Sequence, residues 1–234
     1  MRYSKFTLLV CLFFIRPVWA DIHLSLSENA IQVTGKSEID QTQGNLTSFI
    51  SPSLGLVIQA SIKEKFKLNF SGQLTNVKFS APYARVLKDP ETYLKKYSVG
   101  FLYLLSENKE WRFDLGFEDF PFFANTDQNN ITLTKSNATF INSTYKQTLS
   151  YPFIFNYELS LEAISPLVND FDQGKLGYGY GLALGKEIKN DGNSYNLAMF
   201  YGSQYLPMKS LLIKKDELGI RFLIKIPIKS KTVL

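Results

Sequence analysis

Residues 111–118, WRFDLGFE, decide the fold class of this chain. Large apolar side chains (Trp111, Phe113, Leu115 and Phe117) occupy every second position, and polar or small residues stand between them. This alternation puts one set of residues on each face of a β-strand, because successive side chains point to opposite sides. Such a strand needs an apolar environment on one face and a polar environment on the other. A barrel embedded in lipid around a polar lumen supplies both environments.

The same alternation returns about every 15–20 residues along the rest of the chain. Clusters of Gly, Asn, Asp and Pro separate the extended segments. The sequence predicts ten strands, at residues 27–34, 47–61, 66–80, 94–106, 111–124, 131–147, 153–165, 177–188, 195–206 and 217–228. The predicted fold is therefore an all-β, antiparallel, up-and-down transmembrane β-barrel of about ten strands.

The predicted connectors alternate in length, as tight turns and larger loops do at the two ends of such a barrel. The short connectors are 62–65, 107–110, 148–152 and 189–194, the longer ones are 35–46, 81–93, 166–176 and 207–216, and 125–130 is intermediate.

Two of the predicted strands depart from a regular alternation. The segment 131–147 has the weakest pattern, and a shorter strand with a long excursion is the alternative there. In the segment 66–80 the apolar set changes phase after Thr75, because Val77 and Phe79 are apolar. This change predicts a β-bulge near Asn76.

The N-terminal segment has the features of a secretory signal. Two basic residues precede an apolar run at residues 6–15, and Ala20 ends a small-x-small cleavage site. The run is shorter than the roughly 20 residues that a spanning helix needs. The expected organisation is a signal peptide, residues 1–20, cleaved after Ala20, followed by a single barrel domain, residues 21–234.

Composition excludes several classes of protein. The one cysteine, Cys11, lies in the predicted signal peptide, so the mature chain has no disulfide, thiolate metal site or cysteine nucleophile. Cleavage lowers the net charge from +5 to +2, because three basic residues leave with the signal, and no concentrated basic patch remains for nucleic acid. No later apolar run approaches 18 residues, which excludes a helical inner-membrane protein.

The strand pattern resembles that of the bacterial outer-membrane β-barrel proteins, a class of small, even-stranded, porin-like or OmpA-like barrels. The resemblance covers most of residues 27–228 and includes a last strand, residues 220–228, in which isoleucines and Phe222 alternate with other residues. It implies a location in the outer membrane, with membrane lipid as a partner.

Charged residues on the polar faces predict an ion-pair network in the lumen. The carboxylates Asp114 and Glu118 share a strand face, as do Glu158 and Glu162. Paired carboxylates also act as general acid and nucleophile or bind cations, but nearby basic residues favour the network. The predicted network comprises Lys67, Arg112, Asp114, Glu118, Glu158, Glu162, Arg221 and Lys225.

No catalytic residue, metal site or cofactor is predicted. The enzymes of the resembled class rely on a histidine base, whereas this chain has one histidine, His23, which we expect outside any strand. The glycine-rich run 177–185 lacks the spacing of a phosphate-binding loop, and residues 170–174 lack the register of an EF-hand loop.

The expected function is that of a non-enzymatic outer-membrane barrel, either a structural or surface-interaction protein or a narrow small-ion channel. Ten strands leave little open lumen, and small ions or an external ligand at the loops are the further expected partners. The alternative is a soluble, exported, lipocalin-like barrel that binds an apolar ligand, because alternation alone does not say which face points inward. Small residues among the charged set, such as Gly116 and Ser160, favour that set for the lumen.

Overall fold

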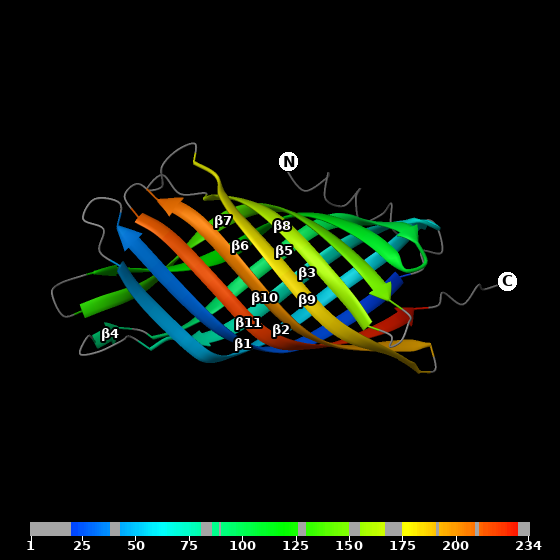
Figure 1. Ribbon diagram of the computed structural model, residues 1–234, viewed down its shortest axis with the longest axis horizontal. Helices are drawn as coiled ribbons and strands as arrows, with labels where there is room; N and C mark the ends of the chain where they lie inside the picture. The colour runs from blue at the N-terminus through cyan, green and yellow to red at the C-terminus, as the bar shows by residue number, and fades with distance from the viewer. Residues whose placement is uncertain are drawn as a thin grey trace, which may run out of the picture.

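The computed structural model describes residues 20–37, 43–80, 86–88, 90–125, 130–149, 155–166, 175–190, 192–208 and 211–228. These residues form ten long strands and one short strand (Figure 1). The strands are β1 (Ala20–Ser37), β2 (Gln43–Lys63), β3 (Phe66–Lys78), β4 (Val86–Lys88), β5 (Glu91–Ser106), β6 (Lys109–Asn125), β7 (Asn130–Leu149), β8 (Phe155–Pro166), β9 (Gly177–Asn190), β10 (Asn193–Met208) and β11 (Leu211–Ile228). Among the described residues, no helix is long and apolar enough to cross a membrane.

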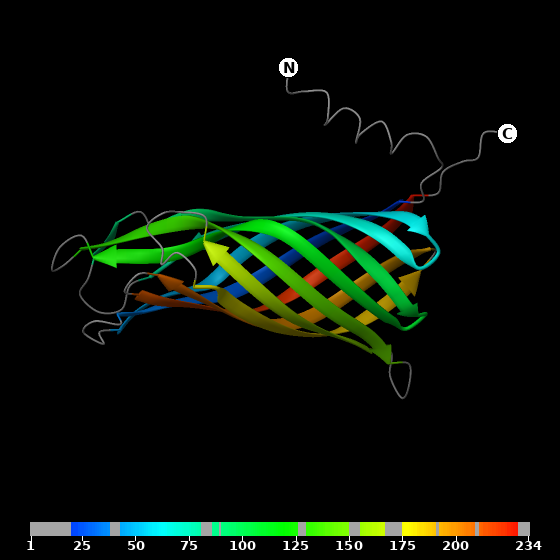
Figure 2. The same ribbon diagram turned by 90° about the horizontal axis from the view of Figure 1, so that it is seen from above.

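The ten long strands close into an antiparallel barrel. Each pairs with its neighbour in the sequence, and β1 pairs with β11 to close the ring. The strands run obliquely around the barrel (Figures 1 and 2). The ladders differ in length: β1–β11 uses every residue of both strands, whereas β8–β9 uses only residues 156–164 of β8. The predicted all-β, up-and-down, ten-stranded barrel is confirmed.

The two ends of the barrel differ. The turn end carries the joins β2–β3, β5–β6, β7–β8 and β9–β10, and the loop end carries the others. The short strand β4 pairs in parallel with the loop-end part of β7, from Val86↔Asn130 to Lys88↔Thr132.

Several predicted strands were shorter than the strands of the structure. The weakly patterned sixth segment is a continuous strand, β7, and not a shorter strand with an excursion. The predicted loop 207–216 is mostly strand, because β11 already begins at Leu211. His23 lies inside β1 and not outside any strand. The predicted signal peptide lies outside the described residues except for Ala20, the first residue of β1.

Along the turn-end part of the wall, large apolar side chains face outward and polar side chains face inward. In β6, Trp111, Leu115 and Phe117 are 51%, 47% and 56% exposed. Asp114 and Glu118, on the other face of the same strand, are 2% and 4% exposed. We call the outward apolar surface the belt. Glu28 is an outward-facing carboxylate beside it, paired in the ladders with Ile220 and Pro52.

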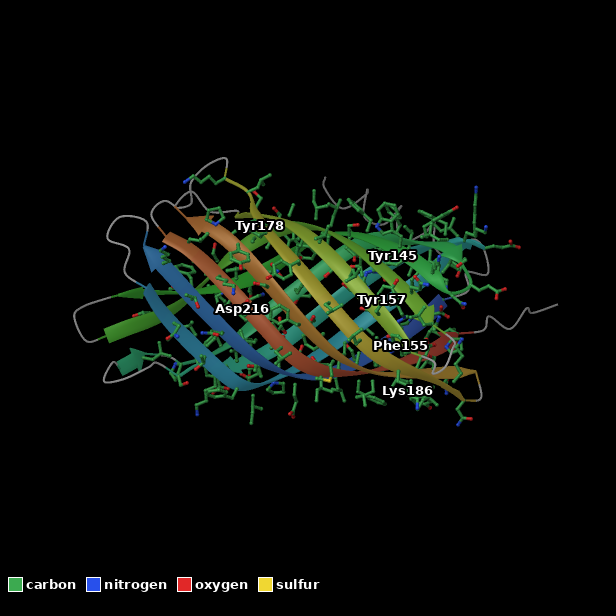
Figure 3. The ribbon with its side chains drawn as sticks, in the orientation of Figure 1. Tyr145, Phe155, Tyr157, Tyr178, Lys186 and Asp216 are labelled. Carbon is green, nitrogen blue, oxygen red and sulfur yellow. The ribbon has the colours of Figure 1, made fainter. Side chains whose placement is uncertain are left out.

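Aromatic side chains gather at both edges of the belt. At the turn end, Tyr145 and Tyr157 both donate hydrogen bonds to Gln147, at 3.0 and 2.7 Å, and Phe155 lies beside them (Figure 3). At the loop end, Tyr178 stacks on Tyr205 with the ring centroids 4.8 Å apart. Amphipathic rings at two levels mark the boundaries between apolar and polar surroundings.

Towards the loop end the polarity of both faces reverses. β2 changes register there, between Ser51 and Ser48, but β3 keeps its alternation in phase. In β3, Leu74 faces outward and Thr75 inward, yet beyond them Asn76 faces outward and Val77 is fully buried inside. The β3–β5 register is continuous from Phe66↔Tyr103 to Lys78↔Glu91. The prediction of a β-bulge near Asn76 is therefore wrong. The polarity of the surroundings changes at this point, whereas the backbone geometry of β3 does not.

The reversed part of the wall encloses a dry interior. Nine of the ten long strands contribute, directly or through a flanking residue, apolar side chains that are each at most 8% exposed. We call this group the collar core; it consists of Ile31, Val33, Leu46, Val77, Phe79, Leu94, Phe120, Ala138, Phe140, Ile164, Leu206 and Ile213. Leu87 of β4 packs against it with Phe122 and Leu133.

Candidate functional site

Below the collar core, the barrel interior holds a polar cavity of about 350 Å³. Serine, threonine and charged side chains make up about half of its lining residues, and a cavity of this size with such polar groups has room for water. Six of the eight residues of the predicted lumen network line it: Arg112, Asp114, Glu118, Glu158, Glu162 and Arg221. The other two, Lys67 and Lys225, lie nearer the turn end.

At the turn end, one carboxylate holds both lysines. Asp21 Oδ2 lies 2.8 Å from Lys67 Nζ and 3.1 Å from Lys225 Nζ. These pairs connect β1 with β3 and β11. Asp21 was absent from the predicted network, because strand β1 begins earlier than the sequence pattern indicates.

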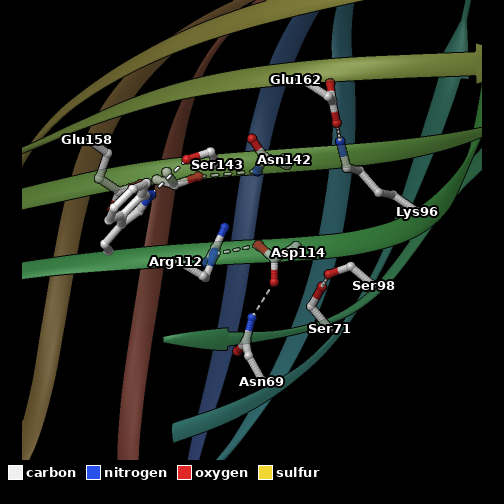
Figure 4. A network of polar contacts seen from close by, with 12 residues as sticks. Asn69, Ser71, Lys96, Ser98, Arg112, Asp114, Asn142, Ser143, Glu158 and Glu162 are labelled. Atoms are coloured by element: carbon white, nitrogen blue, oxygen red, sulfur yellow. Dashed lines mark hydrogen bonds and ion pairs between the residues drawn. The ribbon is translucent and has the colours of Figure 1, made fainter. Parts of the chain in front are cut away.

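In the middle of the lumen, two arginines each hold a carboxylate. Arg112 Nε lies 2.7 Å from Asp114 Oδ2, and Asn69 donates a hydrogen bond of 2.9 Å to the other oxygen of Asp114 (Figure 4). Arg221 Nη2 lies 3.1 Å from Glu158 Oε2, which connects β11 with β8.

At the loop end of the cavity, four side chains form a brace across the lumen. Lys96 Nζ lies 3.0 Å from Glu118 Oε2 and 2.8 Å from Glu162 Oε1. Gln204 Nε2 donates to both carboxylates, at 2.7 Å to Glu118 and 2.5 Å to Glu162. Around the ring, β6 and β10 are separated by three strands on one side and five on the other. The brace therefore joins nearly opposite walls.

The brace uses two residues that sequence reasoning missed. Lys96 and Ser98 alternate with the outward residues Tyr97 and Val99, and this alternation was the available signal for an inward lysine. Gln204 is uncharged and gave none. Within the predicted network, Arg112 pairs with Asp114, whereas Glu118 pairs with Lys96, which lies outside the predicted set.

A glycine leaves room for the brace. A Cβ atom at Gly179, in β9, would lie 3.2 Å from Glu162 Oε2 and 3.0 Å from Gln204 Cγ. Both distances are tighter than ordinary van der Waals contact, so a larger residue would displace the carboxylate or the amide. The alternating glycines of β9 thus face the lumen, and Gly179 lies against the brace.

The brace also borders the collar core. Lys96 Nζ lies 4.1 Å from the centre of the Phe140 ring, and Lys215 Nζ lies 5.2 Å from that of Phe120. Both distances are typical of cation–π contacts. The polar cavity therefore ends against the underside of the dry apolar layer.

The histidine of the chain faces the lumen near its turn end. His23 pairs in the ladders with Lys225 and Val57, and its Nε2 atom has no hydrogen-bond partner among the described residues. Within the same described residues, no group of three His, Cys, Asp or Glu side chains could hold a metal ion. The described lumen side chains thus form ion pairs and hydrogen bonds that connect the strands around the barrel.

Known structures share this architecture. The outer membrane protease OmpT from Escherichia coli matches with a TM-score of 0.51 and 7% sequence identity, over 91% of this chain and 97% of that protein. An outer membrane channel from Pseudomonas putida F1 matches with a TM-score of 0.52 and 14% identity, over 90% and 97% of the two chains. The fold is that of an outer-membrane β-barrel. A scan against protein-family models finds no match, and no curated protein matches the sequence.

The resemblance that the sequence pattern predicted is thus confirmed at the level of the fold. Both neighbours are under 15% identical to this outer-membrane barrel. One is a protease and the other a channel, so a shared architecture supports different activities. The activity of this barrel has to be argued from its own interior and surface.

Proposed function

We propose that this chain is an exported outer-membrane barrel with a closed lumen, which serves as a structural or surface-interaction protein and has no enzymatic activity. In this proposal the belt lies in the hydrocarbon layer and the loop end projects from the membrane. The outward exposure of large apolar side chains, bounded by aromatic rings at two levels, supports this placement.

The collar core carries the proposal of a closed lumen. Its side chains fill the barrel above the brace, and Val33, Leu46, Phe120 and Leu206 are fully buried. An ion entering a dry apolar layer loses its hydration without gaining a partner, which costs many kcal/mol. A continuous aqueous path through this level would require the core to separate.

The outer surface of the loop end supports a role in surface interactions. Outward positions there are polar, for example Gln32, Lys78 and Asn137. A polar wall that continues above the belt lifts the loop end clear of the bilayer. An external ligand at this end is the expected partner, and loops held by a rigid scaffold are common binding surfaces.

A narrow small-ion path is the second candidate, and the charged cavity is the observation that favours it. Arg112, Asp114, Glu158 and Arg221 are among the residues that line the cavity of about 350 Å³. Under this alternative the collar core opens transiently and the cavity forms part of the path.

The soluble lipocalin-like alternative is disfavoured by the distribution of side-chain size. A barrel that binds an apolar ligand places its large apolar residues inside. Here Leu161, Leu197 and Met199 are 70%, 56% and 62% exposed on the outside. The lumen at the same level holds serines, carboxylates and arginines.

The proposed absence of enzymatic activity is supported by the position of His23. A general base needs a partner that orients its ring, in reach of a nucleophile. His23 Nε2 has no such partner among the described residues, and two lysines share Asp21, the carboxylate two positions away. The lumen carboxylates are likewise engaged by basic or amide groups.

Planar-bilayer recording tests the closed lumen. The purified barrel should migrate faster on unheated than on boiled SDS gels, and it should produce no conductance steps when reconstituted. The double variant Phe120→Ala/Leu206→Ala, which hollows the collar core, should produce a leak. Reproducible conductance of the unmodified barrel would favour the ion-path candidate, and quantitative recovery in the soluble periplasmic fraction would contradict the membrane placement.

A further inference from the structure

The outer surface carries an apolar groove of about 590 Å³ across β5 to β8. Its volume lies within the range of small-molecule binding sites, roughly 300–1,000 Å³, and its surface is almost entirely apolar. The large side chains that border it are Tyr97, Val99, Leu115, Phe117, Ile141 and Leu176.

Small outward-facing residues produce the groove. Thr139 pairs with Ser165, and Ile141 pairs with Ala163, across the β7–β8 ladder. Three of these four side chains are small, whereas Phe117 on the neighbouring strand and Leu176 are 56% and 67% exposed. The surface therefore sinks between tall apolar walls at the loop-end part of the belt.

Two lysines stand at the loop end of this groove. Lys95 lies two positions beyond Tyr97 on the same face of β5 and is exposed. Lys135, in β7, reaches Asp119 with its Nζ 3.2 Å from Oδ2 and donates a hydrogen bond to the Tyr93 carbonyl. Two positive charges and one negative charge leave this rim net positive.

We propose that the groove holds one acyl chain of a phosphate-bearing lipid, whose headgroup binds at Lys95 and Lys135. The proposal rests on the membrane placement proposed above. An apolar hollow that opens into the hydrocarbon layer takes a lipid tail, and the positive rim lies at the level where that lipid's headgroup stands. Lysine is a common phosphate ligand, and partial desolvation at the rim strengthens the attraction.

The position of the groove favours a lipid over a second copy of the chain. A copy docked through this face would bury Lys95, Asp119 and Lys135 with a net positive charge and would need an acidic patch opposite. Among the described residues, the outward carboxylates at this level of the other walls are Glu28, beside Pro52 and Ile220, and Asp216, which Lys214 already neutralises at 2.8 Å. A phosphate supplies the missing negative charge within the bilayer itself.

Native mass spectrometry of the purified barrel in detergent tests the site, with dipalmitoyl phosphatidic acid as the probe. Ala163→Leu fills the groove and should lower the lipid-bound fraction about tenfold, the loss expected when about two methylene groups leave an apolar site. Ala30→Leu adds the same side chain to the outer face of β1, away from the groove, and should leave the bound fraction unchanged.

The charged rim is tested with the same probe. Lys95→Gln/Lys135→Gln should weaken binding, whereas Lys186→Gln, on the outer face of β9 near the turn end, should not. Dipalmitoylglycerol, which has the same chains without the phosphate, should bind no better to the unmodified barrel than to the double variant.

Equal retention of lipid by Ala163→Leu and Ala30→Leu would overturn the proposal, as would a dimer in place of the lipid adduct. Heat-modifiable migration of each variant shows that the barrel is folded. A folded, non-conducting barrel that fails to bind lipid would contradict this site alone and leave the proposed function standing.

Discussion

The turn-end and loop-end parts of the barrel wall are made of the same strands but have opposite polarity. In β6, Phe117 faces outward and Glu118 inward, whereas Phe120, two positions after Glu118, is a fully buried inward residue. In β11, Glu217 faces the lumen, and Ile213 on the same face lies in the collar core. One part has the polarity of a membrane protein and the other that of a water-soluble barrel.

This difference shows that the surrounding solvent, and not the geometry of the strand, decides which face is polar and which is apolar. Alternation with period two runs through the reversal without a bulge in β3. In the proposed membrane placement, lipid outside and water inside stabilise the turn-end part, while water outside and an apolar core inside stabilise the loop-end part. The hydrophobic effect therefore acts inward at the loop end only, and the two parts should respond differently to the same kind of substitution.

Truncation of the collar core should have the largest effect. Phe120→Ala leaves a cavity in a dry interior and should lower the free energy of unfolding by about 3–5 kcal/mol. Phe117→Ala, on the outer face of the same strand, should cost much less, because lipid tails refill the space. Urea titration in lipid vesicles measures both values. Equal losses would mean that the upper interior is not a core.

A charge on the belt should have the next largest effect. Phe222→Arg should cost about 2–4 kcal/mol and reduce assembly, because the guanidinium faces hydrocarbon. Asn137→Arg, on the outer face of the loop-end part, should be tolerated. The yield of heat-modifiable barrel compares the two variants. Similar yields would place the upper wall in the bilayer as well.

Loss of the cation in the brace should have a smaller effect. Lys96→Met leaves Glu118 and Glu162 with Gln204 alone and should cost about 1–2 kcal/mol, less than in a dry interior, because water enters the lumen. The double variant Lys96→Met/Glu118→Gln should regain part of this loss in the same urea titration. No recovery would show that the lysine acts through packing against Phe140.

The ion pair on the outer rim should have the smallest effect. Lys135 and Asp119 lie 3.2 Å apart on the outer side of the wall, and the lysine side chain is 42% exposed. Asp119→Asn should change the free energy of unfolding by less than about 1 kcal/mol, and this change should become smaller as the salt concentration rises. A change as large as that of Lys96→Met would mean that the rim is shielded from solvent.

The strands and their faces could be predicted because each follows from local alternation. The alternation of Trp111, Phe113 and Leu115 indicated an outward face from the local sequence alone, without knowledge of the neighbouring strands. The change of polarity in β3 was interpreted as a bulge because the prediction assumed that each face keeps one polarity along the whole strand. The strand in residues 211–216 was missed for the same reason, since Ile213 faces inward where a lumen residue was expected to be polar.

The partners inside the lumen could not be predicted. All eight proposed network residues lie on inner faces of strands, but which cation meets which carboxylate depends on how the closed ring staggers its strands. Asp114 meets Asn69 from two strands away, and Glu118 meets Gln204 from the opposite wall. No local pattern contains that information.

The unequal ladders give the barrel a mechanically weak side. Opening a barrel sideways requires the strands of one ladder to separate, and among the described residues the β8–β9 ladder pairs the fewest residues. The inward residues Gly179 and Gly181 of β9 have no side chains that could contact those of β8, although Gly179 makes room for the brace. The seam between the first and last strands runs their full length. Under lateral tension the wall should therefore part between β8 and β9, while the junction of the two chain ends stays shut.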